Sequence, residues 1–343
     1  MEYRQLGSTG VYVSAISLGT MTFGGPPDHP IWGLVGALPL EESDKILGTA
    51  LDAGVNLIDT ADGYGDGECE EILGKLLGSR RSDVVLTTKL ASRMGPGPND
   101  VGLSRLAVMR GLENSLRRLN TDYIDLYQIH TFDSLTALEE TLTALDDAVR
   151  QGKVRYIGAS NLTAWQTMKA LGISERRGLA RFAALESYYS LAGRDIEAEI
   201  LPMARDQELG HLIYSPLAGG LLSGKFDRNG AADASARRSK ADRPPVDRDR
   251  AYDIIDCLRA IAERHNSGVA RVAVAWVLAQ PGVTSVILGA RRPEQLAETL
   301  GALELELTEQ DLAELDAVSS PVVPAYPRYM QEEYLRYQRL PQS

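Results

Sequence analysis

Apolar segments of strand length alternate with segments of helical spacing along most of this 343-residue chain, and this alternation constrains the fold most strongly. The strand-like segments cover residues 15–21, 55–59, 83–89, 123–130, 154–160, 181–187, 211–215 and 285–289. The helix-like segments cover residues 41–53, 68–77, 103–119, 136–151, 163–171, 195–208, 250–265, 270–279 and 293–300. Buried strands that alternate with helices form parallel sheets covered by helices. Eight such steps predict an α/β fold, a closed (β/α)8 TIM barrel.

The absence of a GxGxxG motif after the first strand argues against the alternative, an open doubly wound sheet. Residues 3–13 predict an N-terminal β-hairpin that turns at residues 7–10. Residues 319–343 form a C-terminal extension with four tyrosines, Tyr326, Tyr329, Tyr334 and Tyr337. Such an aromatic tail is expected to pack across the barrel or against a second subunit, which leaves a homo-oligomer open. We expect one domain over residues 1–343.

Composition limits the function classes. The net charge of −11 argues against a nucleic-acid-binding surface. The apolar runs are far shorter than the roughly 20 residues of a membrane helix, and the N-terminus lacks the pattern of a signal peptide. Cys69 and Cys257 stand in unlike contexts without metal-ligand spacing, so we expect reduced thiols and no metal. A cytoplasmic enzyme is the resulting expectation.

The stretch NLIDTADGYGDG, residues 56–67, carries the first chemical signal. An apolar strand ends on Asp59, and a Gly-rich turn then brings Tyr64 close to that carboxylate. Two further apolar strands end in reactive residues, at Lys89 and at His130. Active sites of (β/α)8 barrels lie at the carboxyl ends of the strands. We therefore expect one mouth to gather the residues at these ends, namely Asp59, Lys89, His130, Ser160, Glu186 and Tyr214.

Several separated motifs carry a family resemblance. They are NLIDTADGYGDGE, LTTKL, YIDLYQIH, VRYIGASN, YSPLAGGLLSGK and LGARRPEQLAE. Their order and spacing, from about residue 3 to residue 318, resemble the aldo-keto reductase superfamily, including its aryl-alcohol dehydrogenase and potassium-channel β-subunit branches. The resemblance implies a catalytic tetrad of Asp59, Tyr64, Lys89 and His130. It also implies NADPH-dependent reduction of an aldehyde or ketone.

The chemistry of carbonyl reduction explains these residue types. Tyr64 can supply the proton, but a free phenol with a pKa of about 10 is a weak acid near neutrality. The ammonium of Lys89 favours the phenolate and is expected to lower that pKa. Asp59 pairs with Lys89 and offsets part of the cost of burying it. His130 donates a hydrogen bond to the substrate carbonyl.

The later strands are expected to hold the cofactor. Ser160 and Asn161 can bond the nicotinamide carboxamide, and Tyr214 offers a ring for stacking on it. Arg291, at the start of the last helix, can bind a 2′-phosphate as a fork, so NADP is favoured over NAD; Arg292 is the competing candidate. The further cofactor residues implied are Glu186, Ser215, Leu217, Gly220, Lys225, Gly289, Gln295, Glu298 and Thr299.

Three residues depart from the family pattern. Glu186 stands where a glutamine is usual beside the nicotinamide, Thr299 where an asparagine is usual near the adenine, and Leu288 where a proline is common. Glu186, if it stays ionised, is expected to favour the oxidised cofactor. The alternative is that it is protonated or turned toward a neighbouring cation.

An apolar or aromatic carbonyl substrate is suggested by Met21, Phe23 and Trp32, together with Trp165. The Gly- and Pro-rich residues 23–39 are interpreted as a pocket wall or as a surface loop. Residues 226–250 are interpreted as a loop that closes on the cofactor phosphates or as a plain insertion. Two alternative functions stay open: a cofactor-sensing regulatory subunit with little turnover, and a Schiff-base aldolase that uses Lys89.

Overall fold

Eight parallel strands close into a barrel in a computed structural model, which describes residues 1–343 except 229, 232–237, 239–240, 322–325 and 339–343. The strand order is β12-β3-β4-β5-β6-β7-β8-β9. Their bounds are β3 (Ile16–Gly19), β4 (Leu57–Asp59), β5 (Val85–Leu90), β6 (Ile124–Ile129), β7 (Val154–Ser160), β8 (Phe182–Tyr188), β9 (Gly210–Tyr214) and β12 (Ser285–Leu288). The predicted (β/α)8 barrel is therefore confirmed.

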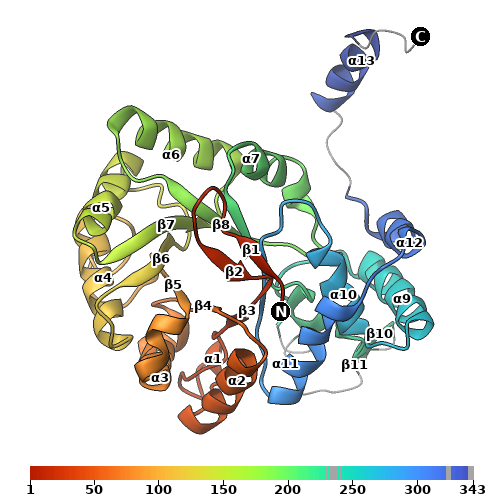
Figure 1. The fold of residues 1–343 in the computed structure, drawn as a ribbon, viewed down its shortest axis with the longest axis horizontal. Coiled ribbons are helices and arrows are strands. Elements are labelled where there is room, and N and C mark those ends of the chain that lie inside the picture. Colours follow the sequence, from red (N-terminus) through yellow and green to blue (C-terminus); the bar gives the residue numbers. More distant parts are fainter. Residues whose placement is uncertain (229, 232–237, 239–240, 322–325, 339–343) are drawn as a thin grey trace.

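Helices surround the strands (Figure 1). The α-helices are α1 (Trp32–Val35), α2 (Leu40–Asp52), α3 (Glu68–Leu77), α4 (Arg105–Arg118), α5 (Leu138–Arg150), α6 (Ala164–Arg177), α7 (Ile200–Asp206), α9 (Arg248–Arg264), α10 (Val269–Leu278), α11 (Pro293–Leu300), α12 (Glu309–Ser319) and α13 (Arg328–Gln338). The 3₁₀ segments are η1 (Tyr64–Gly67), η2 (Gly78–Asp83), η3 (Asp195–Glu197), η4 (Ala218–Ser223) and η5 (Gly301–Glu304).

Two helices differ from their predicted bounds by more than two residues, each for a local reason. Helix α6 begins at a capping box formed by Thr163 and Gln166, and it continues until Gly178, whose φ of +64° ends it in the left-handed region. The helix expected over residues 195–208 is divided into η3 and α7. Pro202 lies in the first turn of α7, where a proline is tolerated, but it has no amide hydrogen to donate to the carbonyl of Ala198, so a helix begun at residue 195 cannot continue through it.

The N-terminal end of the barrel is closed by the predicted hairpin, strands β1 (Tyr3–Gln5) and β2 (Tyr12–Ser14), which pair antiparallel. Leu6 and Val13, both fully buried, extend from it into an apolar cluster inside the barrel; the other buried members are Leu57, Leu126, Ala184, Leu212 and Ile287. Gly7 has a φ of +58°, and a Cβ there would lie 2.6 Å from the backbone nitrogen of Gly210. Only glycine fits so close to the barrel wall.

The C-terminal extension begins at the last residue of α12 and contains α13. Helix α12 packs against α9, whereas α13 projects beyond the outline of the barrel (Figure 1). Arg328 attaches the start of α13 by donating to the carbonyls of Glu197 and Ala198. The side chains of Tyr326, Tyr329 and Tyr334 are exposed, so they do not pack across the barrel. Contact with a second subunit stays a prediction, and the side chain of Tyr337 lies outside the described residues.

Two short strands, β10 (Phe226–Asp227) and β11 (Gly230–Ala231), pair with each other after η4. The expectation of a loop that closes on the cofactor phosphates concerns residues 226–250, of which 229, 232–237 and 239–240 lie outside the described part. Among the helices that the structure describes, none has the length and apolarity that crossing a bilayer requires.

Candidate active site

The candidate catalytic side chains come from strands that lie next to one another in the barrel. Asp59 is the last residue of β4, Lys89 lies near the end of β5, and His130 follows β6 directly. The parallel register pairs Asp59 with Thr87 and Lys89 with Gln128. Because carboxyl ends of parallel strands meet at one edge, these side chains share the mouth of the barrel.

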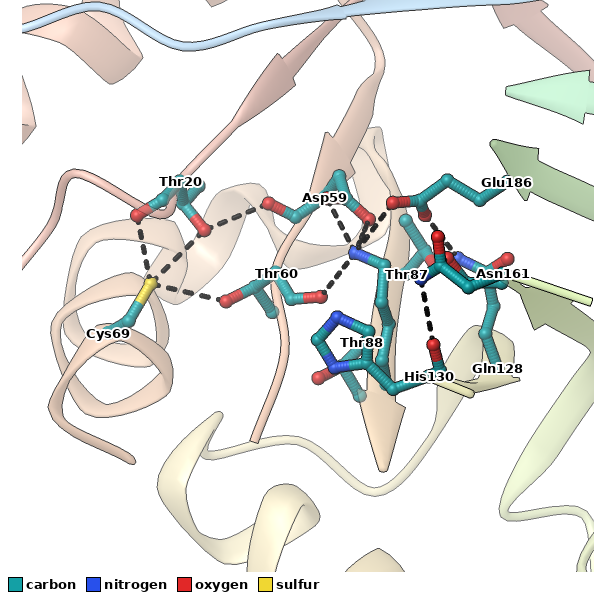
Figure 2. A network of polar contacts seen from close by, with 12 residues as sticks. Thr20, Asp59, Thr60, Cys69, Thr87, Thr88, Gln128, His130, Asn161 and Glu186 are labelled. Atoms are coloured by element: carbon teal, nitrogen blue, oxygen red, sulfur yellow. Dashed lines mark hydrogen bonds and ion pairs between the residues drawn. The ribbon is translucent and has the colours of Figure 1, made fainter. Parts of the chain in front are cut away.

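Lys89 and Asp59 form a buried ion pair (Figure 2). The Lys89 Nζ donates to both carboxylate oxygens of Asp59, at 2.6 and 2.7 Å, and to the Thr60 carbonyl at 3.1 Å. The Lys89 side chain is fully buried. Burial alone lowers the pKa of an ammonium, but the charges of Asp59 and Glu186 outweigh it and raise the pKa of Lys89. Lys89 is therefore a firmly charged ammonium.

Glu186 is a second carboxylate on the same ammonium. Its Oε1 lies 3.2 Å from Lys89 Nζ, and its Oε2 accepts a hydrogen bond of 2.8 Å from Gln128 Nε2. Gln128 also donates to Thr87 Oγ1 at 3.0 Å. Of the two expected arrangements, Glu186 thus adopts the one turned toward a neighbouring cation. Burial and the charge of Glu186 raise the pKa of Asp59 well above its ordinary value despite Lys89.

Tyr64 and His130 complete the cluster. Their rings meet edge to face, with centroids 5.9 Å apart at 77°, and Lys89 Nζ lies 5.4 Å from the centre of the Tyr64 ring. Burial raises the pKa of Tyr64. Lys89 lowers this pKa, as expected, but Asp59 and Glu186 oppose it, so the net pKa is above its ordinary value. Burial, and then Lys89, lower the pKa of His130 to about 3. His130 is therefore a neutral ring at ordinary pH.

The turn that carries Tyr64 is attached to β5 by backbone hydrogen bonds. Thr60 N donates to the Thr87 carbonyl, and Asp62 N donates to the Lys89 carbonyl, each at 3.0 Å. Within the turn, Gly65 has a φ of +58°, and a Cβ there would lie 2.9 Å from Gly25 N. The Gly-rich sequence thus allows a tight bend that brings Tyr64 back over the strand ends.

Behind Asp59 lies a buried thiol. Cys69 contacts the Thr20 carbonyl and hydroxyl at 3.0 and 3.1 Å and the Thr60 hydroxyl at 3.2 Å (Figure 2). Thr20 Oγ1 in turn donates to the Asp59 carbonyl at 2.8 Å. Burial raises the pKa of Cys69 to about 12, and both cysteines are free, as the sequence predicted. This thiol supports the backbone of Asp59 rather than reacting.

The residues predicted beside the nicotinamide are hydrogen-bonded to one another. Asn161 Nδ2 donates to the His130 carbonyl at 2.9 Å and to Ser160 Oγ at 3.0 Å, and Tyr214 Oη donates to Asn161 Oδ1 at 2.8 Å. Ser160 is buried and Tyr214 partly exposed. The mouth of the barrel therefore presents the hydrogen-bonded side-chain amide of Asn161 and the partly exposed ring of Tyr214 next to the candidate catalytic residues.

The residues predicted to contact the rest of the cofactor differ in whether their polar groups are already bonded within the protein. Gly220 has a φ of +96° with open space where a Cβ would lie, although its amide donates to the Leu217 carbonyl. Ser215 and Gly289 are close to the ends of β9 and β12, and Lys225 is exposed. Arg291 Nε donates to the Val35 carbonyl at 2.9 Å, and its Nη2 to that of Leu34.

The remaining residues predicted to bind the cofactor lie in α11 or directly before it. Gln295 Oε1 accepts from the backbone amide of Arg291, while Arg292 and Glu298 are exposed. The Thr299 hydroxyl donates back to the Gln295 and Leu296 carbonyls of its own helix. The Thr299 hydroxyl is thus used within α11 itself.

The residues predicted to line the substrate pocket lie in different surroundings. Trp32 meets the Tyr64 ring at 6.4 Å, and its Nε1 donates to Asp66 Oδ1 at 3.1 Å, a contact the sequence analysis missed. Met21 is partly exposed. Phe23 is fully buried in the main core, so its predicted contact with substrate is corrected: it has no surface to offer. Trp165 is exposed on α6 and meets Phe132 edge to face.

A separate open hollow of about 650 Å³ lies at the other end of the barrel, lined by residues such as Arg4, Gly7, Glu208 and Thr284. It shares no residue with the cluster around Lys89.

The chain belongs to the aldo-keto reductase family. The model of the Aldo/keto reductase family matches residues 15–320. An uncharacterized oxidoreductase of Bacillus subtilis, YrpG, is 40% identical over 93% of this chain and 96% of its own length. A probable voltage-gated potassium channel subunit beta of Arabidopsis thaliana is 35% identical over 89% of this chain and 92% of its own. Versiconal hemiacetal acetate reductase of Aspergillus parasiticus is 33% identical over 94% of this chain and 98% of its own length.

Proposed function

We propose that this chain reduces an aldehyde or ketone to an alcohol with NADPH, in the reversible manner of an oxidoreductase, and that Tyr64 supplies the proton. One observation carries the proposal: Tyr64, Lys89, Asp59 and His130 gather at the mouth of the barrel, with Lys89 held as an ammonium between Tyr64 and Asp59. The family supports carbonyl reduction in general, and the names of two relatives, an oxidoreductase and a reductase, agree with it.

The residues after β7, β9 and β12 fit a nicotinamide dinucleotide. Ser160 and Asn161 offer a hydroxyl and an amide for a carboxamide, and the ring of Tyr214 offers a stacking face. The open backbone at Gly220 suits a pyrophosphate, and the start of α11 suits a further anion. When bound, this cofactor supplies the hydride that the protein itself cannot supply.

Each candidate catalytic residue has one task. The Tyr64 hydroxyl gives its proton to the carbonyl oxygen, and the nearby Lys89 ammonium stabilises the phenolate that remains. Asp59 holds Lys89 in position, and its own backbone is held by Thr20. His130, a neutral ring, donates a hydrogen bond to the substrate oxygen and stabilises the charge that develops there. Met21 and Trp32 line the approach for an apolar substrate.

The Schiff-base alternative is disfavoured by the state of Lys89. Its ammonium donates to Asp59 and Thr60 and lies against Glu186, and these partners raise its pKa. A Schiff base needs a neutral amine, so this lysine is a poor nucleophile.

Turnover tests the proposal directly. The absorbance of NADPH is followed while a panel of aldehydes, ketones and sugars is added to the purified chain. We expect oxidation of NADPH with apolar or aromatic carbonyls and none without substrate. Tight cofactor binding without turnover of any member would instead support a cofactor-sensing subunit, the role that the name of the plant relative suggests for that protein.

A further inference from the structure

The ammonium of Lys89 is shared by two carboxyl groups. Asp59 reaches it from β4 with both oxygens, at 2.6 and 2.7 Å, and Glu186 reaches it from β8 with Oε1 at 3.2 Å. All three side chains are almost fully buried, at 3% exposure or less. Solvent therefore screens this group of charges weakly.

Each carboxylate oxygen of Glu186 faces a donor group. Oε1 faces Lys89 Nζ, and Oε2 accepts from Gln128 Nε2, which is itself held by its bond to Thr87. An ionised carboxylate only accepts hydrogen bonds, so this pattern is the one it requires. In Figure 2, Glu186 lies on the side of Asp59 opposite Cys69.

This group of charged side chains lies next to Tyr64, whose ring centre is 5.4 Å from Lys89 Nζ. The titratable groups that act on this phenol are Lys89 from β5, Asp59 from β4, Glu186 from β8 and Cys69 from α3, with the neutral ring of His130 beside it. Cys69 stays a thiol because burial raises its pKa to about 12. A phenolate at Tyr64 would then add negative charge beside two carboxyl groups that already share one ammonium.

We propose that Glu186 is a positioning residue which, as a second counter-ion of Lys89, keeps the Tyr64 hydroxyl protonated and so biases this site toward carbonyl reduction over alcohol oxidation. The inference rests on the function proposed above. In the reduction, the carbonyl carbon gains the hydride of NADPH, its oxygen takes the Tyr64 proton, and NADP⁺ remains. In the oxidation, the Tyr64 phenolate takes the proton of the alcohol hydroxyl while the hydride passes to NADP⁺. Only the second direction needs the phenolate at the start.

The first test is a titration of the protein without cofactor. The ultraviolet absorbance of phenolate is recorded against pH for wild type, Glu186→Gln and Glu186→Asp, and the trace of the same protein with Tyr64→Phe is subtracted from each. We expect the Tyr64 midpoint to fall by about one pH unit or more in Glu186→Gln, because one anion is lost. Glu186→Asp, which keeps the charge, is expected to remain close to wild type.

Two results would overturn the inference. One is an equal midpoint in wild type and Glu186→Gln. The other is a Glu186→Asp midpoint equal to that of Glu186→Gln, which would mean that side-chain geometry rather than charge matters. Circular dichroism recorded at each pH of the titration confirms that the proteins compared are folded over the range used.

The second test follows turnover against pH. Below the midpoint, kcat/KM for alcohol oxidation follows the phenolate fraction, so it should rise roughly tenfold or more in Glu186→Gln at a given pH. The alkaline decline of kcat/KM for reduction should move to lower pH by the same amount. Unchanged profiles in both directions would contradict the role of Glu186. If no carbonyl is reduced even by wild type, the proposed function fails, while the titration still decides the charge effect.

Discussion

The two ends of the barrel are built from the same strands and the same inward face, yet they hold opposite contents. On β4 the inner residues are Leu57 and then Asp59, and on β8 they are Ala184 and then Glu186. Residues two apart on a strand share a face, so these side chains form two successive layers inside the barrel. The lower layer, with Leu57 and Ala184, is apolar, and the upper layer, with Asp59 and Glu186, is charged. The lower layer joins the hairpin residue Leu6 in a dry cluster. The upper layer buries an ammonium.

This contrast separates stability from chemistry. The apolar layer removes surface from water and needs no partner beyond shape. The charged layer costs free energy to bury, and it persists because Lys89 pairs with Asp59 and Glu186 and because Gln128 donates to Glu186. Changes in the lower layer should therefore alter unfolding, and changes in the upper layer should alter turnover.

The largest effect is expected from Tyr64→Phe at the upper layer. Removing the proton donor should reduce kcat/KM for carbonyl reduction by roughly 10²–10⁴-fold, with little change in the Kd of NADPH. Steady-state kinetics and a fluorescence titration of NADPH measure the two quantities. Tyr156→Phe, beside the lower cluster, is the matched control and should be near wild type in both. Near-normal turnover of the Tyr64 variant would remove this residue from its role.

The complementary change is Leu6→Ala at the lower layer. Deleting a fully buried leucine should reduce the free energy of unfolding by about 2–5 kcal/mol, because it leaves a cavity above the hairpin. Denaturant unfolding measures this loss, and KM and kcat at a temperature where the variant is folded should be close to wild type. Leu135→Ala, at a site 96% exposed, serves as the control and should change stability little. A loss of turnover as large as that of Tyr64→Phe would mean that the two layers are not independent.

A smaller effect is expected at the rim, from Arg291→Ala. If this arginine binds the 2′-phosphate, its loss should weaken NADPH by roughly 1.5–3 kcal/mol and NADH much less. Isothermal titration with both cofactors measures the difference. Because Arg291 also holds the carbonyls of Leu34 and Val35, an equal loss for both cofactors would assign it to that loop instead. The exposed Arg292 is then the residue to replace.

The smallest effect concerns how the charged layer acts on the cofactor. An ionised Glu186 favours the cationic oxidised nicotinamide over the neutral reduced one, and pairing with Lys89 leaves a bias of about 1 kcal/mol. Titrations of NADP⁺ and NADPH into wild type and Glu186→Gln should therefore give ratios of Kd that differ roughly fivefold. Equal ratios in the two proteins would mean that the charge is fully compensated at the nicotinamide.

The sequence predicted the barrel and its mouth because apolar runs stop abruptly at Asp59, Lys89 and His130. Helix α3, for example, has the bounds that its spacing indicated. The partners of Glu186 could not be predicted, because Lys89 and Gln128 meet it across the barrel rather than along one strand. The sign of the Tyr64 pKa shift depends on a balance of burial and three charges that no single motif contains.

The rim was the least predictable part. Phe23 stands in a Gly- and Pro-rich loop, where an aromatic residue can equally fill the core or line a pocket, and only the packing decides. The carbonyl partners of Arg291 lie far away in sequence, in α1. Such contacts depend on how loops from different strands meet, which local patterns do not encode.

The attachment of the Tyr64 turn to β5 has an entropic consequence. The bonds from Thr60 to Thr87 and from Asp62 to Lys89 fix the backbone that leads into the bend before any substrate arrives. The conformational entropy of holding the phenol beside the ammonium is therefore lost once, when the chain folds. A substrate that enters has only its own translation and rotation to surrender, so more of its contact energy remains available to stabilise the transition state.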